Sequence, residues 1–323
     1  MTAVTPMSPT TERAIAFVAS RRERAEALGR NLAEHIDDPA AFAAVLRAAF
    51  VELADAEYLE GQHRVAPGIG PILGVRGPLL GAVQRGFRHA TRRERTSTWL
   101  FVADRLLRMP EMELRWFAFG LLERTIGDEP ERTWQLVRRA AHDAGDWITI
   151  DSLAHVAGRG ILNEPYRWAE LEQLVYSPSR WERRLVGSTV ATIPFIDRRA
   201  GREPLVARKG LELVGQLVGD AEPDVQKALS WALRSLIRVD VAGVTAFSRE
   251  QAERAAATDD GHRAWVVRDT LPKLDPAAAG PIRTRLASIR RRPGAPSTSS
   301  AAEAAERFGG GMLGRARPEP PLA

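Results

Sequence analysis

The sequence predicts an all-α protein built from helical repeats, and three observations support this fold class. Apolar residues recur at spacings of three and four through most of the 323 residues, as they do on one face of a helix. No segment alternates apolar and polar residues in the way a half-buried strand does. Short breaks separate the helical segments, and a pair of helices occupies roughly 35–45 residues, which is the period of HEAT-like repeats. We therefore expect a HEAT-like/ARM-type α-α superhelix (solenoid) with a concave surface.

The expected helices follow one another closely along the chain. Their ranges are 12–34, 39–59, 75–89, 94–109, 111–126, 130–143, 146–158, 167–176, 180–193, 203–218, 222–238, 241–255, 260–271 and 276–290. Several breaks place an acidic side chain just before a proline, as in Asp38-Pro39 and Asp275-Pro276. Such a side chain can cap free N–H groups, and a proline in the first turn gives up no hydrogen bond. Residues 60–74 are rich in glycine and proline and should connect two helices.

The ends of the chain differ in composition from its middle. Residues 1–10 are expected to be an N-terminal tail, and residues 11–290 a single HEAT-like repeat domain. From Arg291 onward the composition shifts to Pro, Gly, Ser and Ala. Such a segment buries too little apolar surface to offset the entropy of ordering it. We therefore expect 291–323 to be a disordered tail, with a transient helix at 301–308.

Composition and charge restrict the possible partners. The net charge is +5 and nearly every basic residue is an arginine, since lysine occurs only at Lys209, Lys227 and Lys273. A GC-rich coding bias explains most of this preference. An anionic partner such as nucleic acid explains it as well, because the guanidinium fork suits phosphate oxygens.

Several other classes of protein and site are not expected. The chain has no cysteine, which excludes disulfides and Cys-ligated zinc or iron–sulfur sites. The six histidines show no metal-ligand spacing, and no glycine-rich nucleotide loop precedes a helix, so we expect neither a metal nor a cofactor. No apolar run is long enough to cross a membrane, and the N-terminus lacks the pattern of a secretory signal. We therefore expect a soluble, cytoplasmic protein without a membrane partner.

Two helices carry a tryptophan on the side away from their apolar face. In 222–238, the apolar residues cluster on one side and Trp231 lies opposite. The same stripe carries the basic residues Lys227, Arg234 and Arg238. A large ring among cations suits a ligand that is anionic and partly flat or apolar. In 146–158, Trp147 and Asp151 lie one turn apart on a face away from the core.

Each of these features also has a simpler interpretation. Repeat proteins bury tryptophans between neighbouring repeats, and we interpret five of the eight in this way: Trp99, Trp116, Trp134, Trp168 and Trp265. Arginine-rich helix faces are usually solvated. Asp151 lies near a helix N-terminus, where an acid interacts favourably with the helix dipole. A third helix, 180–193, has Arg184 and Ser188 on the side away from its inward-pointing residues and Trp181 near the boundary, and this recurrence favours the functional interpretation.

These motifs together resemble the DNA alkylation repair family, the AlkD-type DNA glycosylases. The resemblance is carried by Trp147-x-x-x-Asp151, Trp181-x-x-Arg184 and Gln226-Lys227-Ala228-x-x-Trp231-x-Leu233-Arg234, with a glycine-containing segment at 72–78. It covers about residues 40–275, in the same order. The chain departs from the family pattern at Arg76, where a polar uncharged residue is common, and in the length of the stretch 193–219. Tyr58 is the nearest candidate for the family's N-terminal tyrosine.

The resemblance implies a concave basic face that binds duplex DNA, and it also implies a function and a site. The implied substrate is double-stranded DNA with N3- or N7-alkylated purines, which a monomer would hydrolyse at the N-glycosidic bond in the bacterial cytosol. Asp151 corresponds to the catalytic aspartate, and Trp147 and Trp231 to the rings that contact the deoxyribose of the lesion. The implied DNA-binding residues are Arg76, Arg184, Lys227, Arg234 and Arg238. The alternative is a non-catalytic HEAT-like scaffold that binds DNA or protein through the same surface.

Overall fold

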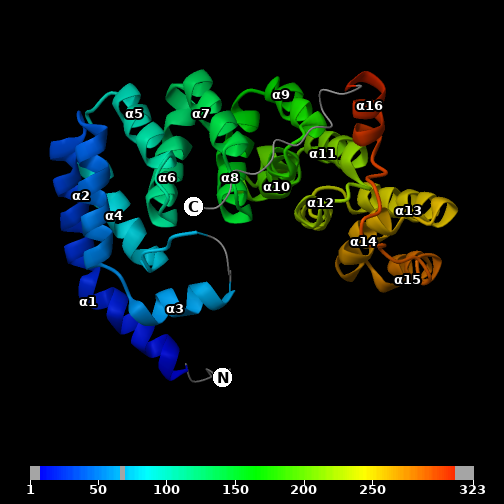
Figure 1. Cartoon of the computed structure of the whole chain (residues 1–323), viewed down its shortest axis with the longest axis horizontal. Coiled ribbons are helices and arrows are strands. Elements are labelled where there is room, and N and C mark those ends of the chain that lie inside the picture. Colours follow the sequence, from blue (N-terminus) through cyan, green and yellow to red (C-terminus); the bar gives the residue numbers. More distant parts are fainter. Residues whose placement is uncertain (1–7, 66–69, 310–323) are drawn as a thin grey trace. The chain divides into compact units, whose positions relative to one another are not determined.

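The computed structural model describes residues 8–65 and 70–309, and this part of the chain contains helices and no strand (Figure 1). The all-α class is therefore confirmed. The helices are α1 (Pro9–Asn31), α2 (Pro39–Glu52), α3 (Ala56–Val65), α4 (Gly77–Ala90), α5 (Thr96–Leu107), α6 (Met112–Asp128), α7 (Pro130–His142), α8 (Trp147–Asn163), α9 (Arg167–Gln173), α10 (Arg180–Ile196), α11 (Pro204–Leu217), α12 (Pro223–Leu236), α13 (Val241–Thr258), α14 (Gly261–Thr270), α15 (Pro276–Arg285) and α16 (Ser300–Gly309). Four short 3-10 helices join them: η1 (Leu32–His35), η2 (Leu174–Tyr176), η3 (Ala200–Arg202) and η4 (Leu271–Lys273). None of the helices within the described ranges has the length and hydropathy needed to span a lipid bilayer.

Capping aspartates start many of the helices. Asp38 accepts hydrogen bonds from the N–H groups of Ala40 and Ala41 at 3.0 Å, and Asp275 accepts one from Ala277 at 2.9 Å. The two breaks predicted from Asp-Pro pairs are thus confirmed as helix starts. Asp residues also cap α8, α13 and α14. Each such cap typically stabilises its helix by about 1 kcal/mol.

One predicted helix is wrong, because 39–59 is two helices. The break lies at Asp55, whose side chain caps α3 by accepting from the N–H groups of Glu57 and Tyr58. The backbone N–H of Asp55 donates to Gly74 at 2.9 Å, and its carboxylate pairs with Arg76 at 2.6 Å. These bonds pull the chain out of the helical path. The expected connection 60–74 is correspondingly shorter, since α3 continues to Val65.

The chain divides into two compact units, one up to Leu136 and one from Val137, with the boundary inside α7. In the first unit, α1 packs against α4 and α5 packs against α6. Glycines permit the approach of α1 to α4, because a Cβ on Gly29 would lie 2.1 Å from the carbonyl oxygen of Val83. Aromatic rings fill the core of this unit: Phe42, Phe50, Phe87, Trp99 and Phe117.

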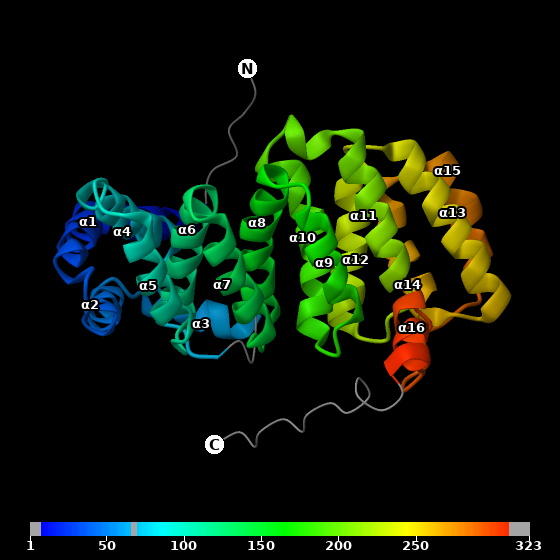
Figure 2. The same ribbon diagram turned by 90° about the horizontal axis from the view of Figure 1, so that it is seen from above.

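The second unit is a stack of helices in two layers (Figure 2). In one layer α8, α10, α12 and α14 pack side by side in that order. The second layer contains α9, α11, α13 and α15. Gly187 of α10 lets α12 approach closely, since its Cβ would lie 2.9 Å from Ala228. Helix pairs stacked in this way are what the repeat pattern predicts, while the concave basic face remains a prediction.

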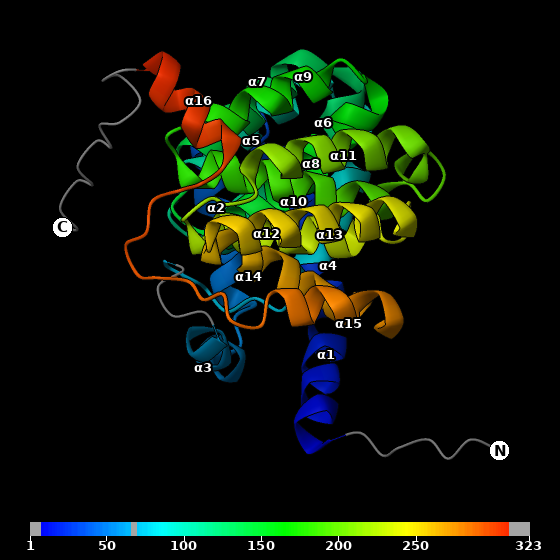
Figure 3. The same ribbon diagram turned by 90° about the vertical axis from the view of Figure 1, so that its right-hand side faces the viewer.

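The segment after α15 corrects the expectation of a disordered tail from Arg291. This segment, 291–299, crosses the N-terminal ends of α12 and α14 and leads to α16 (Figure 3, orange to red). The N–H of Thr298 donates to Gly219 at 2.9 Å, and Arg263 donates to the carbonyl of Thr298 at 3.1 Å. Polar loops of the repeats thus satisfy its backbone, which composition alone did not indicate. Residues 1–7 and 310–323 of the expected tails lie outside the described residues.

Candidate functional site

The start of α8 places Trp147 and Asp151 on one exposed face. Asp146 caps the helix by accepting from the N–H of Thr149 at 2.7 Å and from its hydroxyl at 2.8 Å. This cap fixes the first turn of α8, and Trp147 in that turn is 43% exposed. Asp151 follows one turn later on the same side.

Three donors from α10 hold the carboxylate of Asp151. Arg184 donates through Nε to Oδ1 at 3.1 Å and through Nη2 to Oδ2 at 2.8 Å. The hydroxyl of Ser188 donates to Oδ1 at 2.6 Å. Oδ1 thus accepts two hydrogen bonds and Oδ2 one. Since the Asp151 side chain keeps 20% of its surface exposed, a molecule on this face can reach the carboxylate.

Arg184 lies elsewhere than expected for an arginine that contacts phosphate. Its side chain is only 6% exposed. Its Nη1 donates to the backbone oxygen of Asp224 at 2.7 Å, and its guanidinium carbon lies 5.9 Å from the centre of the Trp147 ring. The guanidinium therefore joins α8, α10 and the start of α12. A bidentate arginine in this position fixes both the place and the orientation of the carboxylate.

The basic stripe of α12 continues the same surface. At the start of α12 the backbone oxygen of Asp224 contacts Arg184, and two residues beyond the end of α12 the guanidinium of Arg238 lies 5.4 Å from the ring of Phe195 on α10. Trp231 is seven residues from both Asp224 and Arg238, so it lies midway along the side of α12 that adjoins α10. Its side chain is half-buried.

The cations of this stripe are not equivalent. Lys227 and Arg238 are exposed, and neither has an ion pair with another described residue. Arg234 is partly buried and pairs with Asp269 of α14. Of the three, Lys227 and Arg238 therefore have the charges that an anionic partner could reach most readily.

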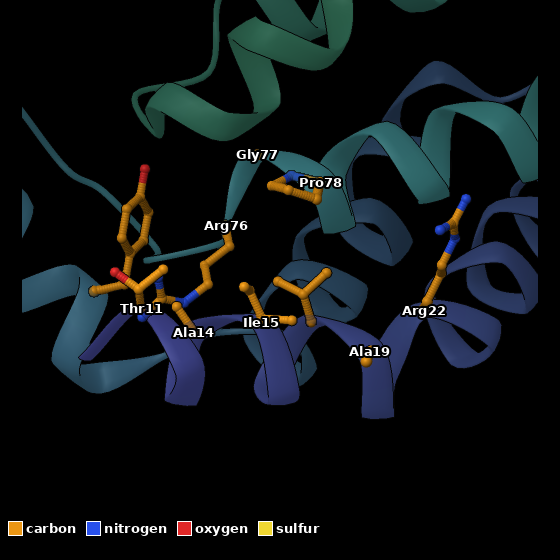
Figure 4. A pocket seen from close by; sticks show the side chains of 10 residues that line it. Thr11, Ala14, Ile15, Ala19, Arg22, Arg76, Gly77 and Pro78 are labelled. Atoms are coloured by element: carbon orange, nitrogen blue, oxygen red, sulfur yellow. The ribbon is translucent and has the colours of Figure 1, made fainter. Parts of the chain in front are cut away.

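Arg76 belongs to the first unit, where its guanidinium contacts neighbouring side chains. Its Nε donates to Asp55 at 2.6 Å, and its guanidinium lies 5.0 Å from the ring of Tyr58. Burial opposes the charge on Asp55, but the hydrogen bond from Arg76 and those from the backbone lower the pKa of that carboxyl. Burial, followed by the nearby charge of Glu113, raises the pKa of Tyr58. Arg76 and Tyr58 also line a pocket of about 480 Å³ beside the N-terminal half of α1 (Figure 4).

A family model described as DNA alkylation repair enzyme matches residues 46–259, more than half of the chain. The chain belongs to the DNA alkylation repair enzyme family. The matched region contains every candidate site residue identified from the sequence. No curated protein matches the chain. Membership of the family indicates an enzyme whose substrate is DNA.

Within this DNA alkylation repair enzyme, the structure brings Trp147, Asp151 and Arg184 into direct proximity and places Trp231 on the adjoining helix. Arg76 lies in the other unit. His155, one turn beyond Asp151, is exposed and no hydrogen bond joins it to another described residue. Among the described residues, no three His, Asp or Glu side chains gather in a way that could hold a metal ion.

Sequence reasoning missed two contributions to the site. Helical spacing places Ser188 on the outer side of its helix, whereas the structure buries it and its hydroxyl donates to the Asp151 carboxylate at 2.6 Å. The backbone oxygen of Asp224 accepts a hydrogen bond from Arg184, and a contact with a backbone carbonyl cannot be predicted from the pattern of side chains. Of the tryptophans expected to be packing residues, Trp99, Trp134 and Trp168 are buried, and Trp116 and Trp265 are partly buried.

Proposed function

We propose that this protein is a DNA glycosylase that removes N3- and N7-alkylated purines by hydrolysis of the N-glycosidic bond, the first step of base excision repair. One observation carries the proposal. Asp151 is an accessible carboxylate held by Arg184 and Ser188 beside the exposed ring of Trp147. Family membership supplies the DNA substrate.

The chemistry of the lesion suits this arrangement. Alkylation at N3 or N7 makes the purine cationic and hence a good leaving group, so the reaction needs no general acid. As the bond breaks, positive charge moves to the deoxyribose. Asp151 stabilises this charge and orients the attacking water, with Oδ2 the less occupied of its two oxygens.

The two tryptophans add to this stabilisation. The face of an aromatic ring is electronegative and attracts a nearby cation by about 0.5–2 kcal/mol. Trp147 lies on α8 and Trp231 on α12, with α10 between them. A deoxyribose bound at Asp151 would thus lie near the ring of Trp147 on one side of α10 and the ring of Trp231 on the other.

Cations on the same surface would hold the DNA backbone. Lys227 and Arg238 are exposed, and Arg234 lies between them on the stripe of α12. Contacts of this kind position DNA without reading its sequence. Arg184 is assigned a different role, that of positioning Asp151, and Arg76 remains a proposed contact from the first unit.

Base release from methylated DNA tests the proposal directly. The purified protein is incubated with duplex DNA that contains 7-methylguanine, and free base is quantified over time. We expect release by the wild type and a loss of at least about a hundredfold in Asp151→Asn, because the amide cannot stabilise the developing cation. Asp37→Asn makes the same chemical change at an exposed aspartate of the first unit whose side chain has no bond with another described residue, and it should behave as the wild type.

Two results would overturn the assignment. If the wild type binds DNA but releases no base, the protein is a non-catalytic DNA-binding scaffold. If Asp151→Asn keeps wild-type activity, the protein is a glycosylase with a different catalytic group.

A further inference from the structure

The C-terminal ends of α8, α10 and α12 lie together where the basic stripe of α12 ends, at Arg238. Gly158 of α8 adjoins α10 so closely that its Cβ would lie 2.5 Å from Ile196. Phe195, near the end of α10, is 48% exposed and lies under the guanidinium of Arg238. We use the term arginine turn for the segment 197–202 that follows α10.

The arginine turn has a defined structure. The carboxylate of Asp197 accepts from the N–H groups of Arg199 at 2.7 Å and Ala200 at 2.8 Å, and these bonds lower the pKa of Asp197. Gly201 packs directly on the end of α10, since a Cβ there would lie 2.1 Å from the carbonyl oxygen of Ile193. A turn fixed by these contacts holds the side chains of Arg198 and Arg199 in solvent.

The arginines of this surface have no ion-pair partner. Arg159, Arg198, Arg199 and Arg238 are all exposed, and none of them has an ion pair within the described part of the chain. The charge of Asp197, whose Oδ1 caps the turn, interacts with Arg199 and Arg159 and offsets part of their positive charge.

Several other surface arginines have a carboxylate partner. The ion pairs Arg24–Glu52, Arg47–Glu111 and Arg285–Glu253 have separations of 2.6, 2.6 and 2.8 Å. Arg238 lies over the exposed ring of Phe195, and Arg159 and Arg199 both interact with the charge of Asp197, two residues further along the chain. Exposed arginines without an ion pair beside an apolar ring fit an external anion with an apolar part. The sugar–phosphate backbone of DNA has both.

We propose that the arginine turn, with Arg159, Phe195 and Arg238, is a second DNA contact that binds the backbone on one side of the lesion. Its placement relative to the lesion rests on the proposed function. Phe195 follows Arg184 by eleven residues on α10, which corresponds to about 16 Å along the helix. A duplex lying along this helix would reach the arginine turn about five base pairs from Asp151.

The salt dependence of binding to undamaged duplex DNA tests this contact without requiring catalysis. The double variant Arg198→Ala/Arg199→Ala is compared with the wild type by fluorescence anisotropy between about 50 and 200 mM salt. Loss of two phosphate contacts should lower the slope of log K against log salt by about 1.8 and weaken binding about tenfold at moderate salt. Phe195→Ala should weaken binding with the slope unchanged.

A matched control removes the same charge elsewhere. Arg249 on α13 and Arg283 on α15 are exposed, and Arg249→Ala/Arg283→Ala should retain the wild-type slope. Circular dichroism melting of each variant checks that the fold is intact. If the arginine-turn variant keeps the wild-type slope, or if the control loses as much as it does, the proposed contact is wrong.

This experiment separates the two proposals. If the wild type releases no base but the double variant has a smaller salt slope than the wild type, the glycosylase proposal is wrong and the DNA contact is retained. If the wild type releases base but the double variant keeps the wild-type salt slope, the glycosylase proposal is retained and the DNA contact is wrong.

Discussion

Arg184 and Asp151 form a bidentate ion pair between α10 and α8, with donor–acceptor distances of 3.1 and 2.8 Å. The guanidinium is nearly inaccessible, while the carboxylate is partly exposed. The pair therefore presents one acidic face to solvent from a rigid support. Its loss should affect both the fold and the chemistry, and conservative substitutions can separate these effects.

Arg184→Met should leave Asp151 without its main partner and lower the free energy of unfolding by about 3 kcal/mol. Arg184→Lys keeps the charge but cannot form the two parallel bonds, so it should cost less stability and still reduce base release. Urea unfolding and base release measured on both variants check this. Wild-type release by Arg184→Lys would show that the bidentate geometry is unimportant.

Ser188→Ala removes the 2.6 Å hydrogen bond to Asp151 and should lower the unfolding free energy by about 1 kcal/mol. It should also slow base release, because Oδ1 loses one of its two donors. Ser248 is a suitable comparison, since its hydroxyl is buried with no hydrogen-bond partner in the described part of the chain. Ser248→Ala should be neutral or stabilising, and equal destabilisation by the two substitutions would contradict the assigned role of Ser188.

Trp231→Ala should slow base release about 2- to 30-fold, the range that a single cation–π interaction provides. Trp231→Phe should recover part of this loss, because a smaller ring retains a negative face. Affinity for undamaged DNA should change little in either variant, as the phosphate-binding cations remain. If Trp231→Ala only destabilises the fold, the ring serves packing alone.

The Asp55–Arg76 pair should make the first unit sensitive to acid. The pKa of Asp55 is lowered in the folded state, so its contribution to stability is complete above the unfolded pKa, about 3.9, and is lost as the pH falls through the folded value. Thermal unfolding followed from pH 7 to pH 3 should show a smaller decline for Asp55→Asn than for the wild type. An unchanged decline would mean that Asp55 does not contribute to the acid sensitivity.

Local chemistry explains which parts of the fold could be predicted from the sequence. Helix starts at Asp38-Pro39 and Asp275-Pro276 depend on neighbouring residues, and both were found. The break at Asp55 depends on Gly74 and Arg76, which lie some twenty residues away, and periodicity continued across it. The order of the segment 291–299 depends likewise on distant loops.

The same distinction applies to the site. Spacing placed Trp147 and Asp151 on one face of a single helix, and the structure agrees. Spacing could not reveal that Arg184 turns toward Asp151 rather than toward solvent, because this depends on how α8, α10 and α12 stack. The sequence pattern is the same for an arginine exposed to solvent and for a buried arginine that holds a carboxylate.

The segment 291–299 has a consequence for how this protein can be cut. Gln226, one residue before Lys227, bonds to Arg291 at 2.9 Å and to His262 at 3.1 Å, and His262 in turn contacts the carbonyl of Ala295 at 3.1 Å. A fragment trimmed to the family-matched boundary at residue 259 would remove all three partners. Helix α12, which carries Lys227 and Trp231, would then lose these stabilising contacts near its N-terminal end. Truncation or proteolysis after residue 259 should therefore destabilise the surface assigned to DNA.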